Sequence, residues 1–403
     1  MTATLTRPAT RRRQAGILVL ACLVLLVDGY DLFALGTIGP SLLHDRSWGA
    51  SPSTLGTLGS VTALGMPFGS VLAGWAADRR GRRLPMTVAA AWISLSMLGA
   101  ALASDLVQLG AARFCTGIGI GALAPLVSAL VADTAPAGRR TLHLAIALGS
   151  IGVGGTASAL LGRILLPGHP FQTLFWIGVL PILLIPLIWR IVPSGALRPS
   201  ARVSVTAQAA ELFTRTTARG TVLLWVATFM SMALVYSTTA WLPTVMVKNG
   251  YNLGSSLEFL TAFTVGASLG GLLVALLADR GHLKAVTAGT FALAAVALLA
   301  LSSNQPRPVL LVVSALAGLG SLGCQNMIIA CMSAFYRPHL RGTALGVGLG
   351  VGRLGAIVGP SYVSAATALV VSPRAGFVAF MIPAVLGAAV VALLPRTLAP
   401  APE

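Results

Sequence analysis

Long apolar runs, separated by short polar or basic gaps, follow one another along the whole chain. Each run is close to the roughly 20 residues that a helix needs to cross the hydrocarbon core of a bilayer. The runs do not alternate apolar and polar positions, as the strands of a membrane barrel would. The pattern predicts about twelve membrane-spanning helices, over residues 16–40, 54–77, 85–103, 107–131, 142–165, 171–190, 221–246, 255–278, 284–302, 308–334, 342–370 and 375–394.

The longest polar stretch lies near the middle of the chain, at residues 191–219, and is rich in Pro, Ser, Thr and Arg. It separates the predicted helices into two sets of six. Short motifs recur across it: PAGRRT at 136–141 and PHLRGT at 338–343 lie 202 residues apart, and AADRR at 76–80 is echoed by LADRG at 277–281. Repeats of this kind are typical of transporters with a site between duplicated halves.

We therefore expect an all-α membrane protein of two pseudo-symmetric six-helix bundles. The predicted divisions are 1–190 for the first bundle, 191–219 for a central cytoplasmic loop and 220–403 for the second bundle.

Composition agrees with a chain that is almost entirely embedded in lipid. Hydrophobic residues make up 56% and charged residues 9%, whereas soluble domains carry about 25% charged residues. The four cysteines all lie in apolar runs without metal-ligand spacing, so we expect no metal or cofactor. No arrangement of nucleophile, base and metal indicates an enzyme.

The net charge of +17 concerns orientation, because the basic residues fall in short gaps and form no single patch. If the N-terminus is cytoplasmic, twenty of the 27 basic residues fall in cytoplasmic segments. We expect both termini in the cytoplasm and no nucleic-acid partner. The two lysines against 25 arginines favour a GC-rich bacterial genome and an inner membrane.

Only two of the ten acidic residues fall inside the predicted bilayer, and they lie close together in VLLVDGYDLFALG. Asp28 and Asp31 share a helix face at i and i+3, and repulsion between like charges in a low dielectric favours a proton on at least one of them. We interpret the pair as the proton-coupling site, with Glu258 as the reserve candidate. The alternative is that one aspartate only pairs with an arginine and holds two helices together.

Arg113 and Arg353 are the two embedded arginines, one in each half. A guanidinium holds a carboxylate through two parallel hydrogen bonds, so an anionic substrate explains both residues. The alternative for Arg113 is a permanent pair with Asp28 or Asp31. Further candidates for contacts with an aromatic acid are Tyr30, Phe33, Tyr236, Trp241, Gln325 and Asn326, although ordinary packing also explains the aromatic residues.

The loop after the second predicted helix reads GWAADRRGRR, at residues 74–83. We expect Gly74 to let a neighbouring helix approach and Asp78 to accept hydrogen bonds from a helix N-terminus. An ordinary positive-inside loop would explain the arginines but not the glycine and the aspartate at these positions. The residues expected to control the conformational change are Gly74, Asp78, Arg79, Gly81, Arg82 and Arg83, together with Arg341 in the second half.

With twelve helices and a central loop, the pattern GxxxDRxGRR in this segment resembles the major facilitator superfamily. DGYD at 28–31, the same loop, and GCQNMIIACMSAFYRPHLRGTALGVGLGVGRLGAIVGP at 323–360 are similar to its aromatic acid:proton symporter family. The resemblance places the functional residues of that family on Asp28, Asp31, Asp78, Arg113, Arg341 and Arg353. Three features depart from the family pattern: the second-half loop is contracted to ADRGHLK, the central loop is short for the family, and Asp133 stands where a glutamate is more usual.

Together these observations predict a monomeric secondary transporter that takes up a small aromatic carboxylate with protons by alternating access. Two other transport functions stay open: a proton-coupled exporter of drugs or metabolites, and a symporter of another organic anion. Drug antiporters often carry a Gly-Pro motif in the fifth helix, which here reads GSIGVGGTASALLG and lacks the proline. A transport-inactive sensor would need a signalling domain, and the sequence contains none.

Overall fold

Residues 11–136, 139–193, 211–214, 217–278, 282–303, 305–337, 340–370 and 372–394 are described by the computed structural model of the chain, and all regular structure in them is helical. Most of the predicted central loop and both chain ends lie outside these residues, so the predicted divisions at 190 and 220 stay predictions. Eleven helical spans within the described residues are long and apolar enough to cross a membrane. With α10 (Leu253–Ala278), the chain has the twelve predicted passes.

The first six passes begin at Arg11 and end at Ile191. Their helices are α1 (Arg11–His44), α2 (Pro52–Arg80), α3 (Arg83–Ala101), α4 (Leu106–Thr134), α5 (Arg140–Leu165) and the interrupted set α6 (Gln172–Ile177), η2 (Leu180–Leu184) and α7 (Ile185–Ile191). A short turn of helix, η1 (Arg46–Trp48), links α1 to α2. Besides α10, the second six comprise α9 (Ala218–Lys248), α11 (Leu283–Ala300), α12 (Arg307–Phe335), α13 (Arg341–Leu369) and α14 (Ala375–Ala392).

The sixth pass was predicted as one continuous helix. In the structure it is built from three short helices. Pro181 and Pro186 fall within it, and a proline can neither donate a backbone hydrogen bond nor fit in the interior of a regular helix. Each proline instead occupies the first turn of the next helical piece, where its missing N–H is not needed.

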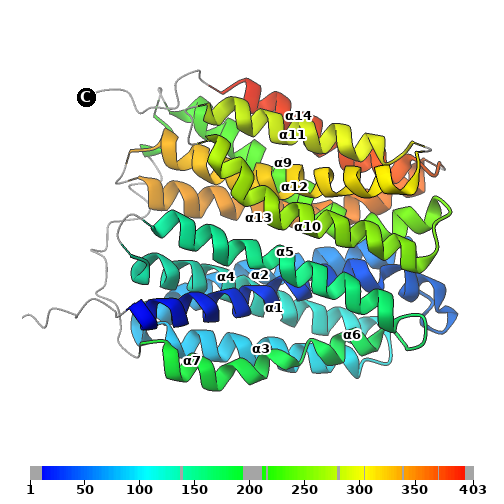
Figure 1. Ribbon diagram of the computed structural model, residues 1–403, viewed down its shortest axis with the longest axis horizontal. Coiled ribbons are helices and arrows are strands. Elements are labelled where there is room, and N and C mark those ends of the chain that lie inside the picture. The colour runs from blue at the N-terminus through cyan, green and yellow to red at the C-terminus, as the bar shows by residue number, and fades with distance from the viewer. Residues whose placement is uncertain are drawn as a thin grey trace, which may run out of the picture.

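The helices form two side-by-side groups, with α1 to α7 in the lower half of Figure 1 and α9 to α14 in the upper half. The same packing order recurs in each group. In the first, α1 packs against α5 and α2 against α4; in the second, α9 packs against α13 and α10 against α12. Repeated pairing agrees with the internal repeats in the sequence.

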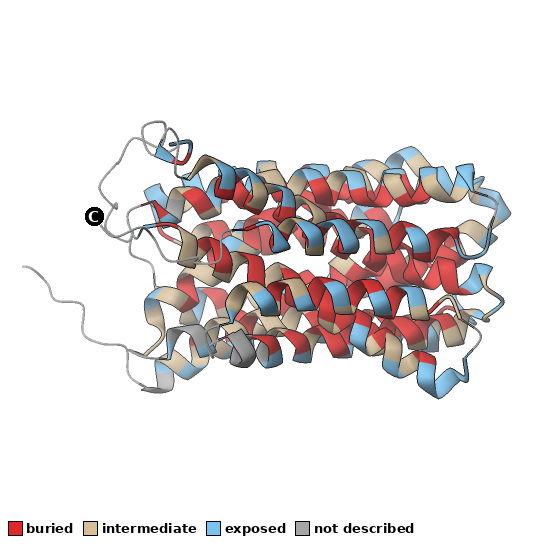
Figure 2. Ribbon diagram, turned by 90° about the horizontal axis from the view of Figure 1, so that it is seen from above, coloured by how far each residue is buried: buried red, intermediate tan, exposed pale blue. Residues whose placement is uncertain are grey.

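Buried positions concentrate between the helices, whereas the outward faces carry many exposed side chains (Figure 2). Large apolar residues are among the exposed ones, such as Val71, Val107 and Leu369. An apolar outer surface is what contact with lipid tails requires, so burial and composition point to the same environment.

The two helix groups contact each other at one end of the bundle and in its middle. Gly36 on α1 lies so close to α9 that an added Cβ would be 1.9 Å from the Thr239 carbonyl oxygen. The Ser60 and Ser361 hydroxyls, on α2 and α13, are 2.7 Å apart. At the other end, no described atom lies within 4 Å of a Cβ built on Gly74 or Gly346. The structure is therefore closed at the end where α2 begins.

Candidate functional site

A small cavity lies between the two helix groups, in the middle of the bundle. Its lining comes from α1, α2, α4, α9 and α13: Leu32, Leu35, Gly59, Thr62, Ala63, Met66, Arg113, Tyr236, Thr239, Ala240 and Pro360. The cavity has a volume of about 20 Å³, which is room for about one water molecule. A larger solute therefore needs the helices to move apart.

Arg113 is the charged group of this cavity and is 1% exposed. Its Nε donates to Thr62 Oγ1 at 3.3 Å, and its Nη2 donates to the backbone oxygen of Asp31 at 3.3 Å. Its Nη1 is buried without a hydrogen-bond partner among the described residues. The guanidinium also lies 6.0 Å from the centre of the Phe175 ring, at the limit of a cation–π contact.

Asp28 and Asp31 are buried beside this group, with exposed fractions of 4% and 0%. Asp28 Oδ1 and both carboxyl oxygens of Asp31 lack a hydrogen-bond partner among the described residues. The permanent Asp–Arg ion pair considered above is not formed here, because the described residues include no carboxylate oxygen within 4 Å of Arg113. Asp31 and Arg113 still interact electrostatically, as do Asp28 and Arg353.

Gly29, between the two aspartates in the sequence, holds α1 close to α5. A Cβ on this residue would lie 1.9 Å from the Ile151 carbonyl oxygen, so only glycine permits α1 and α5 to pack this closely. The contact packs α1 against α5 on a face other than the one that Asp28 and Asp31 share.

Tyr236 and Arg353 reach the same region from the second helix group. Tyr236 lines the cavity, and its hydroxyl donates to Met66 Sδ at 3.3 Å, a weak acceptor. Arg353 is half-buried on α13 and interacts electrostatically with both Tyr236 and Asp28. Charged and polar groups of both halves therefore converge on one place.

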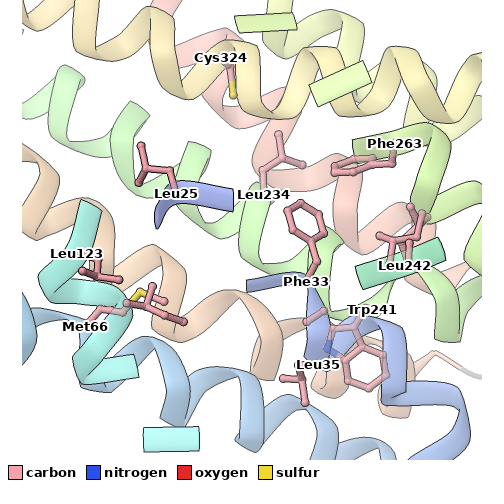
Figure 3. Packing of buried hydrophobic residues seen from close by; sticks show 14 of the residues in the cluster. Leu25, Phe33, Leu35, Met66, Leu123, Leu234, Trp241, Leu242, Phe263 and Cys324 are labelled. Carbon is pink, nitrogen blue, oxygen red and sulfur yellow. The ribbon is translucent and has the colours of Figure 1, made fainter. Parts of the chain in front are cut away.

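The remaining predicted substrate residues do not line the cavity in this conformation. Tyr30 donates its hydroxyl to the Leu174 carbonyl oxygen at 2.8 Å, and Trp241 donates Nε1 to the Pro360 carbonyl oxygen at 2.9 Å. Phe33 packs against Gly155. In Figure 3, Phe33 and Trp241 lie together with Leu35 among buried side chains. Their observed role is packing between helices.

Gln325 and Asn326 lie on α12, half-buried and away from the cavity lining. The Asn326 amide nitrogen instead lies 2.8 Å from where a Cβ on Gly271 of α10 would be. This contact lies between two helices of the second group.

The predicted gating loop makes its described contacts within the first helix group. Arg82 forms an ion pair of 2.6 Å with Asp133 at the end of α4, and Arg83 Nε donates to the Val192 carbonyl oxygen at 2.7 Å. Arg79 stacks over Trp75 at 4.1 Å. Gly81 has a φ of 72°, a left-handed value that favours glycine. These contacts and the turn fix the path from α2 into α3.

The two expected gating contacts, those of Gly74 and Asp78, are absent among the described residues of this conformation. Gly74 has no close helix neighbour among the described residues, and Asp78 is exposed, with no hydrogen bond to a described helix N-terminus. Arg341 is exposed and donates to the Tyr336 carbonyl oxygen at 3.0 Å within its own half. The contacts of this loop and of Arg341 among the described residues therefore lie within their own helix groups.

Glu258, the reserve candidate for proton coupling, lies at the closed end between two arginines. Its carboxylate contacts Arg163 of α5 at 2.7 Å and also pairs with Arg307 of α12. Two cations stabilise the charged form of this carboxylate, which argues against a role as a proton carrier.

Sequence reasoning missed Thr62 and Met66, which supply the α2 wall of the cavity. Neither belongs to a motif, and each looks like an ordinary residue of an apolar helix. Only the packing of α2 against α4 gives them a role, so no local signal could have identified them.

The comparisons with known proteins agree with this arrangement. The family model of the Major Facilitator Superfamily matches residues 21–360, and again 255–403. The chain belongs to the major facilitator superfamily. This transporter is 33% identical to the benzoate transport protein of Acinetobacter baylyi, over 94% of its own length and 89% of that protein. It is 31% identical to the gentisate transporter of Corynebacterium glutamicum, over 96% and 88%.

The 4-hydroxybenzoate transporter PcaK of Pseudomonas aeruginosa is 30% identical, over 85% of this chain and 84% of that protein. Among solved structures, the D-xylose-proton symporter superposes with a TM-score of 0.79 at 18% identity, over 95% of this chain and 98% of that one. The latter likeness concerns the fold alone. The protein is thus a multi-pass transporter of the superfamily, related to aromatic acid transporters, and not an enzyme.

Proposed function

We propose that this superfamily member takes up a small aromatic carboxylate of the benzoate or hydroxybenzoate type together with protons. The observation that carries the proposal is the Arg113 guanidinium, buried at the interface of the two halves with one nitrogen unpartnered beside an apolar cavity. A buried cation without a carboxylate partner is costly, and an anionic substrate supplies the missing partner.

The wall of the cavity supports an aromatic ring as the other part of the substrate. Leu32, Leu35, Ala63 and Met66 offer apolar contacts, and Tyr236 offers a ring face and a hydroxyl. The names of three relatives at 30–33% identity support the same substrate class: they are a benzoate, a gentisate and a 4-hydroxybenzoate transporter.

Asp28 and Asp31 are the proposed proton carriers. Both are embedded carboxyl groups; Asp31 lies beside Arg113, Asp28 interacts with Arg353, and three of their oxygens have no hydrogen-bond partner among the described residues. A proton on either one removes a charge from the interior and weakens its attraction for the neighbouring arginine. Protonation of an aspartate and binding of the substrate carboxylate therefore influence each other, as competition or cooperation, through their shared partners Arg113 and Arg353.

With the N-terminus in the cytoplasm of a bacterial cell, the closed end of the bundle faces outward and the substrate leaves toward the inside. The protein would work as a monomer in the inner membrane by alternating access, with the loop around Asp78 and the start of α13 at Arg341 forming contacts when the inner end closes. This orientation follows the positions of the basic residues along the chain.

The substrate class is tested by competition against labelled benzoate uptake in cells that express the protein. Hydroxybenzoates should compete. Cyclohexanecarboxylate keeps the charge and lacks the aromatic ring, benzamide keeps the ring and lacks the charge, and tetraphenylphosphonium represents cationic drugs; these should compete weakly or not at all. Efflux of the phosphonium ion without benzoate uptake would favour the exporter instead.

A further inference from the structure

Thr62 lies directly against the buried guanidinium of Arg113 and is itself 5% exposed. Its hydroxyl donates to the Leu58 carbonyl oxygen of its own helix at 2.7 Å. A threonine hydroxyl has a single proton, so this bond leaves the oxygen of Thr62 only as an acceptor for other groups. The Arg113 Nε–H, 3.3 Å away, is the donor that meets it.

The second anchor of the guanidinium is the backbone oxygen of Asp31, which accepts from Nη2 at 3.3 Å. Thr62 on α2 therefore accepts a hydrogen bond from Nε, and Asp31 on α1 accepts one from Nη2. The nitrogen that they leave is Nη1, buried and without a partner among the described residues. Nη2 carries a second N–H, so the Nη1 and Nη2 edge keeps two parallel donors, the arrangement that binds a carboxylate bidentately.

We propose that Thr62 is a positioning residue that fixes the rotation of the Arg113 guanidinium, so that its Nη1 and Nη2 edge faces the substrate carboxylate. This inference rests on the proposed function, because it needs Arg113 to bind the carboxylate. Without the Thr62 acceptor, the planar group can rotate about its last bonds and present Nε, Nη1 or Nη2 in turn. The binding energy then includes the cost of ordering the group.

The test compares three variants of the full-length purified protein by equilibrium binding of labelled benzoate. Thr62→Val keeps the shape and removes the acceptor, and should weaken binding about tenfold. Thr62→Ser keeps the hydroxyl, and should stay within about twofold of the wild type. Thr116→Val is the matched control: Thr116 is buried on α4 one turn from Arg113, makes the same kind of bond to its own helix, and does not line the cavity.

Thermal unfolding of each variant accompanies the binding measurement. If Thr62→Val does not fold, Thr62→Ala serves in its place, since it also removes the acceptor. Equal weakening in Thr62→Val and Thr62→Ser, or the same loss in Thr116→Val, would assign Thr62 a packing role and overturn the inference. Wild-type affinity in Thr62→Val would overturn it too. All three results leave the proposed function intact as long as the wild type binds benzoate; absence of wild-type binding would remove the proposed function and this inference together.

Discussion

Arg113 carries the central electrostatic problem of the molecule. Its charge is buried among helices of both halves, its two hydrogen bonds reach neutral oxygens, and no described carboxylate oxygen lies within 4 Å. A buried ion in this situation is destabilising, since desolvation is not offset by a direct partner. The arrangement is understandable when the partner is a ligand that comes and goes.

We expect Arg113→Lys to weaken binding of aromatic carboxylates by on the order of tenfold, because an ammonium keeps the charge but has no planar fork. Equilibrium binding of labelled benzoate to purified protein measures this. Arg163→Lys is the matched control, since that side chain is half exposed at the closed end. Equal affinities for wild type and Arg113→Lys would move the carboxylate site away from Arg113.

Asp28→Asn and Asp31→Asn should separate substrate binding from proton-coupled accumulation. An amide keeps the size of the side chain and cannot carry the transported proton, so at least one variant should lose accumulation against a gradient. Exchange of labelled for unlabelled substrate should continue, because it needs no net proton movement. Asp105→Asn is the control, since asparagine also caps a helix N-terminus well, as Asp105 does for α4. Full accumulation in both variants would refute the coupling assignment.

Among individual residues, the sequence identified the charged members of the site but not the uncharged residues around them. An aspartate or arginine within an apolar run stands out because its burial is costly, and the structure places Asp28, Asp31 and Arg113 together. Trp241, Phe33, Gln325 and Asn326 were further candidates for substrate contacts, with packing as the alternative for the aromatic pair. Whether such a side chain faces a cavity or a neighbouring helix depends on tertiary packing, which no local pattern encodes.

Helices were the most predictable elements of this protein. A bilayer fixes their length, so apolar runs locate them to within a few residues; α4 spans Leu106–Thr134 where 107–131 was predicted. The ends extend further because polar first and last turns also stay helical, as at Arg11 in α1. Hydropathy alone did not reveal that the sixth pass is interrupted, because Pro181 and Pro186 are themselves compatible with an apolar run.

Close helix contacts give a prediction about stability. Gly36→Ala adds a methyl group that meets the Thr239 carbonyl oxygen of α9 at 1.9 Å, which should cost about 1–3 kcal/mol and lower the melting temperature. Gly289→Ala is the matched control, because its added Cβ meets no described atom within 4 Å. Thermal unfolding of the detergent-purified variants compares the two. Equal melting temperatures would mean that α1 and α9 are not packed this tightly in solution.

For the whole molecule, the distribution of contacts between the halves defines the state that the structure represents. Ser60 meets Ser361, Thr156 meets Thr264, and Arg163 meets Glu258 across the interface. At the opposite end, a Cβ added to Gly74 or Gly346 would meet no described atom of another helix within 4 Å. Transport by alternating access requires the closed end to open in turn.

A disulfide between positions 60 and 361 tests that requirement. The two serine hydroxyls are 2.7 Å apart, so Ser60→Cys combined with Ser361→Cys should bring two thiols within reach of a bond. Oxidation should then abolish uptake, and a reductant should restore it. Each single variant, which retains the four native cysteines, is the control for unrelated oxidation. Full cross-linking with undiminished uptake would show that this end does not open during transport.

Uptake of labelled 4-hydroxybenzoate into proteoliposomes, with and without an acidic exterior, tests the central claim most directly. Protein-free vesicles give the baseline, because neutral aromatic acids cross bilayers unaided. We expect accumulation above the external concentration when the exterior is acidic, and its collapse on addition of a protonophore or in the coupling-deficient aspartate variant. Protein-dependent uptake of equal extent with and without the proton gradient would contradict it.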